Sequence, residues 1–337
     1  MNARLALFAL LLVALAGTAA GCTRSASSEE ATSREGAAGD SSSAARAAAI
    51  TDQAYLTADL WNDGEAEVAF YRAQRTAEDA SGRPTEEQFL VGTYLVKHRF
   101  NAEAMTKAGQ ATGPAAGADA IDAFKYALFY ELESGSYEFK RHWVANARQR
   151  DLRPLKASFS SFDWCSNRYE ELAFRPSGGD GEKDSVRSLK RSDDYGNARR
   201  RFARQGGAFP AQMRPLLARG LDFSEKRERR FSIALPDGEH VGATARLAGP
   251  DTLALPAETG TRRQAAERIA VTYDRPVPAM IAEETGTGET YWRSAGPARK
   301  LLKVEGDGYA MTLEEALRSP YWKENVWSRL ARVSERP

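Results

Sequence analysis

Residues 231–247 read FSIALPDGEHVGATARL, and this stretch decides the fold class of the chain. Apolar side chains recur at every second position on both sides of Pro236-Asp237-Gly238, which is the period of a strand with one buried face. An Asp-Gly pair tolerates the positive φ that a tight turn between two strands requires. The stretch therefore predicts a β-hairpin whose strands are residues 231–235 and 241–247.

The same two-residue period continues along most of the chain. It predicts further strands at residues 65–75, 89–100, 124–130, 137–144, 268–273, 290–293, 300–304 and 309–313. Gly306-Asp307-Gly308 joins the last two of these strands as a second hairpin. Closing or half-closing such a sheet would limit its exposed edges. We therefore expect a mainly β fold, an antiparallel curved sheet or half-barrel with a few short helices.

Helical signals occur at two places. Residues 210–219 have the pattern of a short amphipathic helix that ends at Gly220. Ser319 before Pro320 is typical of a helix start, which predicts a terminal helix through Trp322 and Trp327.

The N-terminus has a different composition. Arg4 is followed by an apolar run over residues 5–16 and by the small-residue site Ala19-Ala20-Gly21-Cys22. The run is shorter than the roughly 20 apolar residues that span a bilayer, and a plain secretory signal needs no cysteine at its cleavage site. The stretch resembles a bacterial lipoprotein signal. That resemblance implies lipidation of Cys22 as the first mature residue and, because Thr23 rather than Asp follows it, an outer-membrane location.

Residues 23–49 contain no aromatic residue and no Leu, Ile, Val or Met, so they cannot bury enough apolar surface to fold. The expected organisation is a signal peptide over residues 1–21, a lipidated cysteine and disordered tether over 22–49, and one β-rich periplasmic domain over 50–330. Lys and Arg number 47 against 46 Asp and Glu, which gives no reason to expect a nucleic-acid partner. After lipidation of Cys22 only Cys165 would remain, so no intramolecular disulfide is expected.

The sequence carries no catalytic signature. It lacks the G-x-S-x-G, H-E-x-x-H and C-x-x-C patterns and the P-loop. His98, His142 and His240 fall on separate predicted strands, so a shared metal site would need them to converge by chance. We expect no cofactor, no metal and no enzymatic activity.

An aromatic-rich segment runs from Phe124 to Trp143. Its side chains could line a pocket for an apolar ligand or fill an ordinary core. The candidate lining residues are Tyr126, Tyr130, Phe139 and Trp143.

Three smaller features allow two interpretations each. Cys165, after Trp164, is expected to be buried rather than reactive, because free cysteines are usually buried. Pro320-Tyr321-Trp322 is expected to dock on the sheet rather than bind a partner. The arginines at 199–201, with Arg204, could grip lipid phosphates or lie in a solvated loop, and solvation is the default.

Several short segments resemble landmarks of a family of envelope lipoproteins whose members are sometimes labelled septum formation inhibitor Maf. They are residues 60–67 with Phe70-Tyr71, Asp163-Trp164-Cys165, Phe209-Pro210-Ala211 with Leu221-Asp222-Phe223, and Ser319-Pro320-Tyr321-Trp322-Lys323. True Maf enzymes are cytoplasmic nucleotide pyrophosphatases, and their nucleotide-site pattern does not occur here. The segments at 289–292 and 299–304 are also similar to the last hairpin of Lol-like curved-sheet domains, the fold of periplasmic lipoprotein carriers.

Together these features predict a lipid-anchored outer-membrane protein that binds or carries lipid or acyl chains without enzymatic activity. An alternative is a structural or assembly role beside other envelope proteins. A further alternative is a hydrolase whose site has no recognisable motif.

Overall fold

The structure, a computed structural model, describes residues 50–78, 81–112, 120–134, 137–163, 166–175, 184–194, 196–257, 260–282, 284–326 and 328. These residues all belong to one unit within residues 36–337. Cys22, the tether and the Trp164-Cys165 site lie outside the described residues. Within the described ranges, no helix has both the length and the apolar character needed to cross a membrane.

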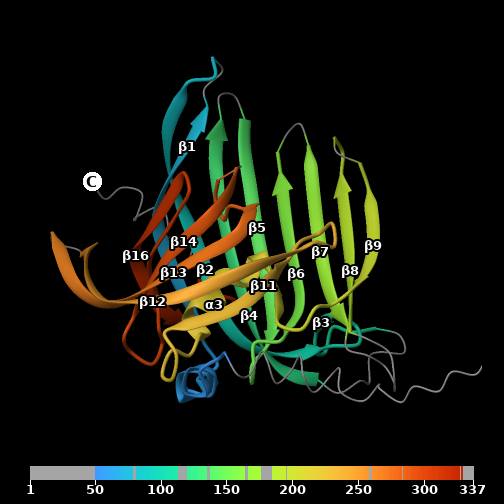
Figure 1. The fold of residues 1–337 in the computed structure, drawn as a ribbon, viewed down its shortest axis with the longest axis horizontal. Coiled ribbons are helices and arrows are strands. Elements are labelled where there is room, and N and C mark those ends of the chain that lie inside the picture. Colours follow the sequence, from blue (N-terminus) through green and yellow to red (C-terminus); the bar gives the residue numbers. More distant parts are fainter. Residues whose placement is uncertain are drawn as a thin grey trace, which may run out of the picture. The chain divides into compact units, whose positions relative to one another are not determined.

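One sheet of 16 strands forms the domain (Figure 1). Its strands are β1 (Ala66–Glu78), β2 (Pro84–Asn101), β3 (Thr106–Lys107), β4 (Ala120–Ser134), β5 (Tyr137–Arg148), β6 (Pro154–Phe162), β7 (Asn167–Arg175), β8 (Ser185–Ser192), β9 (Ala198–Ala203), β10 (Ala208–Pro210), β11 (Glu228–Ala234), β12 (His240–Pro256), β13 (Thr261–Pro278), β14 (Thr285–Ser294), β15 (Leu301–Gly306) and β16 (Tyr309–Ser319). The helical segments described are α2 (Gln53–Leu56), η1 (Asp59–Asn62), η3 (Ala211–Met213) and α3 (Arg214–Gly220). The fold is therefore mainly β, as expected.

The strand order is β10-β11-β12-β13-β14-β15-β16-β1-β2-β4-β5-β6-β7-β8-β9, with β3 beside β2. Neighbours pair antiparallel except β10 and β11, whose short pairing is parallel. The first strand lies in the middle of the sheet, because β1 pairs with β16 on one side and with β2 on the other. Register shifts in several pairs, such as the one at Gly249 in β12, let these long strands bend.

The two ends of the sheet approach each other through side chains. Ser188 of β8 donates a hydrogen bond to the Pro236 carbonyl at 2.6 Å, and Arg200 of β9 donates to the Asp237 carbonyl at 2.9 Å. The rings of Phe202 and His240 lie 5.9 Å apart, edge to face. The sheet is thus open in its backbone pairing, but side-chain contacts link its ends.

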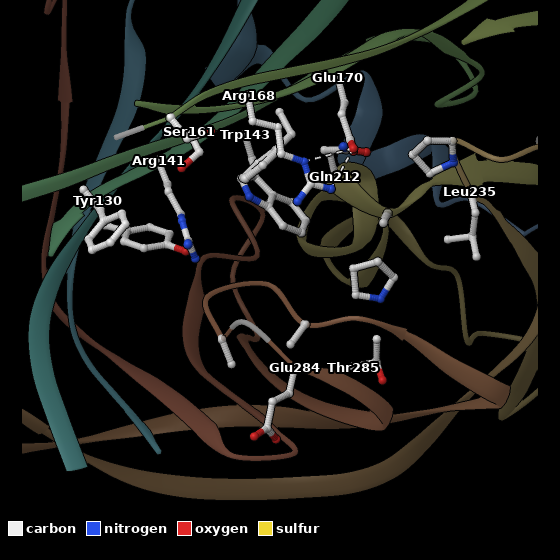
Figure 2. A pocket seen from close by; sticks show the side chains of 18 of the residues that line it. Tyr130, Arg141, Trp143, Ser161, Arg168, Glu170, Gln212, Leu235, Glu284 and Thr285 are labelled. Atoms are coloured by element: carbon white, nitrogen blue, oxygen red, sulfur yellow. Dashed lines mark hydrogen bonds and ion pairs between the residues drawn. The ribbon is translucent and has the colours of Figure 1, made fainter. Parts of the chain in front are cut away.

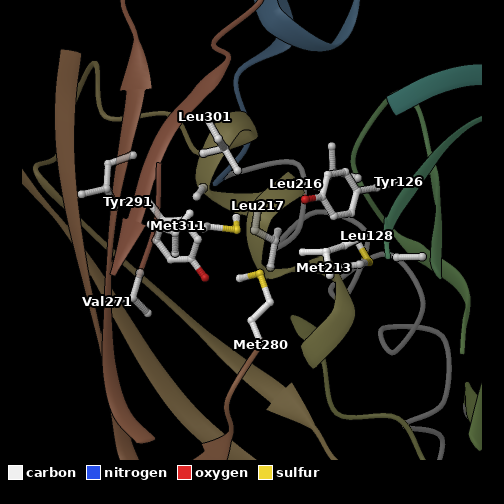
Figure 3. Packing of buried hydrophobic residues seen from close by; sticks show 14 of the residues in the cluster. Tyr126, Leu128, Met213, Leu216, Leu217, Val271, Met280, Tyr291, Leu301 and Met311 are labelled. Atoms are coloured by element: carbon white, nitrogen blue, oxygen red, sulfur yellow. The ribbon is translucent and has the colours of Figure 1, made fainter. Parts of the chain in front are cut away.

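A short helical segment fills much of the concave side of the sheet. Every residue of α3 is buried, although the sequence pattern predicted an amphipathic helix. Figure 3 shows Met213, Leu216 and Leu217 between Tyr126 and Leu128 on one side and β13, β14 and β16 on the other. The apolar residues of two distant parts of the sheet therefore meet α3 rather than each other.

The opposite, convex face carries a second apolar cluster that includes Val68, Phe70 and Tyr94. Residues 320–326 cover it: the Tyr321 ring stacks on Tyr94 with centroids 4.7 Å apart, and Val326 is buried. The expected docking of this segment is found for Tyr321, whereas Trp322 is 53% exposed.

The terminal helix predicted from Ser319-Pro320 is wrong over its first turn. Strand β16 continues to Ser319, and residues 321–323 form a turn. The Ser319 hydroxyl donates to a Glu324 carboxylate oxygen at 2.9 Å instead of capping a helix. Backbone pairing with β1, which reaches Ala66 opposite Ser319, extends β16 beyond the end that local sequence propensity predicts. Trp327 lies outside the described residues.

Strands β6 to β9 were missed by the sequence analysis. They carry many Ser, Arg, Lys and Glu residues, so their apolar alternation is weak. The arginines at 199–201 are exposed but belong to β9 rather than to a loop. Arg204 is buried and pairs with Asp184 at 3.2 Å, so it is not part of a solvated cluster.

Candidate ligand-binding pocket

A pocket of about 610 Å³ opens on the concave side of the sheet, beside the region that α3 fills (Figure 2). Strands β5, β6 and β7 form one wall, η3 contributes Ala211 and Gln212, and the opposite wall comes from residues 234–236 and 278–285. The lining residues are Tyr130, Phe139, Arg141, Trp143, Phe159, Ser161, Asp163, Ser166, Arg168, Glu170, Asp194, Ala211, Gln212, Ala234, Leu235, Pro236, Pro278, Ala279, Ala282, Glu284 and Thr285.

Strand alternation puts the aromatic side chains of this wall on the same side of the sheet. Phe139, Arg141 and Trp143 occupy every second position of β5, so they project to the same side. Trp143 pairs directly with Phe159 of β6, and their rings meet edge to face with centroids 5.8 Å apart. Because these rings are held by neighbouring strands of one sheet, the apolar wall is formed before any ligand arrives.

Three of the four predicted lining residues come together here. Tyr130, Phe139 and Trp143 line the pocket. Tyr126 does not: it is 3% exposed and packs in the core beside α3 (Figure 3). The difference arises because α3 covers the part of β4 that carries Tyr126, and no local sequence pattern indicates which part of the strand is covered.

Polar groups stand among the rings. Trp143 is only 8% exposed, and its indole N–H has no acceptor among the described residues. Figure 2 shows the Arg141 guanidinium directed into the pocket, and it also lies 5.8 Å from the Phe139 ring. Arg168 and Glu170 form an ion pair at 2.7 Å, and Glu284 belongs to the opposite wall. Such a lining can hold an apolar body while pairing with a polar end group.

A buried arginine fixes two pieces of the pocket wall. Arg214 donates to the Ala211 carbonyl at 3.0 Å and to the Pro278 carbonyl at 2.7 Å, and both of those residues line the pocket. Its third bond, at 2.7 Å, goes to a Glu289 carboxylate oxygen. Its guanidinium also lies 5.8 Å from the Trp143 ring. The ion pair therefore holds η3 and the end of β13 in place.

Three tyrosines complete the coordination of the Glu289 carboxylate. Tyr273 and Tyr309 donate to it at 2.7 and 2.6 Å, and Tyr291 donates as well. Burial and the nearby carboxylate charge raise the pKa of all three phenols, so they remain hydrogen-bond donors. Burial alone would lower the pKa of Arg214, but the Glu289 charge reverses this and raises it. The buried charges are thus paired and hydrogen-bonded, as burial requires.

A second set of buried arginines anchors α3. Arg219 donates to both Glu67 oxygens, at 2.7 and 3.0 Å. Arg293 donates to the carbonyls of Ala218, Arg219 and Leu221 at 2.9–3.0 Å, which satisfies the C-terminal end of the helix. These bonds fasten α3 to β1 and β14 at the boundary between the filled core and the pocket.

The histidines do not form a site together. His98 Nε2 donates a hydrogen bond to Asn146 Oδ1 at 3.1 Å, and burial lowers the pKa of His98 to about 4. His142 packs on Phe129 and His240 on Phe202. Within the described ranges, no three His, Cys, Asp or Glu side chains lie close enough to hold a metal ion.

Comparison with known proteins gives little. No protein-family model matches the sequence, and no curated protein is significantly similar to it. One similar solved structure is the beta-barrel-like protein of the domain of unknown function DUF1849 from Brucella abortus, with a TM-score of 0.43 and 6% identity. The match covers 75% of this chain and 97% of that one. The resemblance to envelope lipoproteins therefore remains a prediction.

The polar residues of the pocket lining were not predicted from the sequence. Arg141 shares the alternation of Phe139 and Trp143, so the same pattern could have placed it on this wall. Phe159 could have been added by recognising β6. Gln212 lines the pocket from η3, and Glu284 lines it from the segment between β13 and β14. No local sequence pattern predicts that these two segments contribute to the pocket.

Proposed function

We propose that the protein is a non-enzymatic, lipid-anchored module of the outer membrane that binds the apolar chain of a lipid or lipoprotein in the concave-side pocket. The observation that carries this proposal is the open aromatic wall of Tyr130, Phe139, Trp143 and Phe159 beside a core that is otherwise filled. A volume of about 610 Å³ lies in the range of small-molecule sites, which is about 300–1,000 Å³.

The proposed binding mode places the apolar chain against the rings and the polar end group near Arg141. The Trp143 indole N–H would gain its missing acceptor if a ligand oxygen reached it, and a buried unpaired donor costs roughly 1–3 kcal/mol. Four carboxylates and two arginines, Arg141 and Arg168, line the pocket, so its net charge does not favour a multiply anionic head group. A single carboxylate or a neutral ester suits it better.

Titration with a fluorescent fatty acid tests this proposal. We expect saturable binding that Phe139→Ala weakens roughly tenfold, which corresponds to about 1.4 kcal/mol. Phe162→Ala is the matched control, because Phe162 is on the neighbouring strand, is 53% exposed and does not line the pocket. Absence of saturable binding, or equal weakening by both substitutions, would refute the proposal.

Membrane attachment is a separate part of the proposal and rests on the sequence around Cys22. Cys22→Ser should abolish incorporation of labelled fatty acid and release the protein from the outer-membrane fraction. If the substituted protein still incorporated label and stayed in that fraction, the anchor would be assigned wrongly.

A role in envelope assembly is the second candidate. The observation in its favour is that two large apolar side chains, Phe162 and Trp322, are each 53% exposed. Exposed rings of this kind occur at protein interfaces. Cross-linking from these two positions in membranes, compared with the fatty-acid titration, separates the two functions.

A further inference from the structure

The pairing of β2 with β4 stops partway along both strands. Their register runs from Asn101 opposite Ala120 to Val91 opposite Tyr130 and ends there. Beyond that point β2 continues to Pro84 paired with β1, and β4 continues to Ser134 paired with β5. Figure 1 shows the β1–β2 hairpin leaning away from the β4–β5 hairpin. Two strand edges thus face each other across a split in the sheet.

A cleft of about 940 Å³ occupies this split. It is lined by Glu87, Gln88, Phe89, Leu90, Tyr94, Phe129, Tyr130, Glu131, Leu132, Glu133, Glu138, His142 and Tyr321. Tyr130 is shared with the concave-side pocket, and the other lining residues are not. The cleft is therefore a distinct site.

The two faces of the cleft differ in chemistry. Phe89 and Leu132 belong to the apolar cluster of the concave side. Glu131 and Glu133 are exposed and, by strand alternation, project to the opposite side, where Glu138 lies close enough to share Lys140 with Glu131. A strand placed between the two edges would meet Phe89 and Leu132 on the concave side, where Glu87 also projects. On the other side it would meet Glu131 and Glu133 beside the apolar side chains of Leu90 and Phe129.

The charge of the lining has one sign. Among the residues that the structure describes, four glutamates line the cleft, and no lysine or arginine does. Glu87 has an ion pair with Arg75 at 2.7 Å, and Glu131 and Glu138 contact Lys140 at 3.0 and 3.4 Å. Glu133 adds a further exposed carboxylate. Arg75 and Lys140 balance two of the four carboxylate charges, so these groups keep a net charge of about −2, which favours a cationic partner.

We propose that the cleft binds an extended segment of another protein by strand addition, with apolar side chains alternating with lysine or arginine. The backbone of such a segment would pair with the edges of β2 and β4 that have no strand partner among the described residues. The alternation would place its apolar side chains on Phe89 and Leu132 and its basic side chains near Glu131 and Glu133. At about 3.3 Å per residue, six or seven residues fill the length from Pro84 to Leu90. This interaction does not depend on lipid binding in the concave-side pocket.

The test uses a labelled seven-residue peptide of alternating valine and lysine, with blocked termini, titrated into the purified full chain by fluorescence anisotropy. We expect saturable binding to the protein. Exchanging the lysines for glutamates, or methylating alternate backbone nitrogens, should each reduce the affinity at least tenfold. The second change removes the donors that strand pairing needs while keeping the charge.

Protein variants locate the interaction. Glu131→Gln with Glu133→Gln should weaken binding several-fold, whereas Glu225→Gln with Glu239→Gln, which removes the same charge from exposed positions elsewhere, should leave the affinity unchanged. Bound peptide should slow amide hydrogen exchange in residues 84–90 and 131–134. Binding that tolerates backbone methylation, or that protects neither segment, would overturn strand addition and show only charge attraction.

Discussion

The concave side of the sheet contains two regions built from the same kind of strand residue but completed differently. Around α3 the interior is filled, and the buried guanidinium of Arg219 reaches both oxygens of Glu67. In the pocket the aromatic wall of β5 and β6 faces open space, and the Trp143 indole N–H has no acceptor among the described residues. The comparison teaches that strand alternation decides which side chains face inward, whereas a distant segment decides whether the space in front of them is filled.

The first prediction, among the largest expected effects, concerns the ion pair of the filled region. Arg219→Leu should lower the free energy of unfolding by about 3–5 kcal/mol, because it leaves the Glu67 carboxylate buried without its partner. The double variant Arg219→Leu with Glu67→Leu should lose clearly less. Urea unfolding followed by circular dichroism measures both. Equal losses in the single and double variants would show that the pair is not the source of the stability.

A second prediction compares one aromatic residue from each region. Tyr126→Ala should cost about 3–5 kcal/mol of unfolding free energy, the usual cost of an aromatic in a filled core. Phe139→Ala should cost clearly less, because Phe139 is only partly buried and lies at the open pocket. Thermal and urea unfolding of the two variants check this. If the two losses were equal, the pocket wall would be as tightly packed as the core, and the contrast between the regions would fail.

A third prediction concerns acid, and it involves a group in neither region. Burial lowers the pKa of His98 from 6.5 to about 4. Between these values the unfolded chain binds a proton that the folded chain does not, so stability is complete above about pH 6.5 and is lost as the pH falls towards 4, by up to about 3 kcal/mol. His98→Gln should flatten this part of the pH profile of unfolding. The difference between Tyr126→Ala and Phe139→Ala should stay constant across the same range. A pH-dependent difference would mean that acid acts through one of the two regions instead.

The sequence predicted the architecture well where apolar alternation is strong. The hairpin of β11 and β12, the pair of β15 and β16, and strands β1, β2, β4 and β5 all lie where the two-residue period placed them. Strands β6 to β9 were not predicted, because their inward-facing positions line the pocket or lie at the ends of the sheet. Polar residues such as Ser161 and Arg168 can occupy these positions, whereas a filled core requires apolar side chains there.

The candidate site was predicted only in part, for a physical reason. Three of the four aromatics line the pocket because β4 and β5 are adjacent and their alternation is clear. Tyr126 fell in the core because α3, about 90 positions later in the chain, packs on it. Contacts of this kind depend on how the sheet curves, and no local pattern encodes them. The alternation also could not reveal that the pairing of β2 and β4 ends at Val91.

The position of β1 has a consequence for how the molecule is made. Arg72 of β1 and Glu314 of β16 form an ion pair across strands although they are 242 positions apart in the chain. Contacts with such large sequence separation form slowly, because the chain entropy of a long loop must be lost before they stabilise anything. During synthesis, the edge of β1 that pairs with β16 therefore stays without its partner until nearly the whole chain has been made. Chaperones would bind this unpaired edge of β1, and proteases would readily cleave a chain that ends before β16.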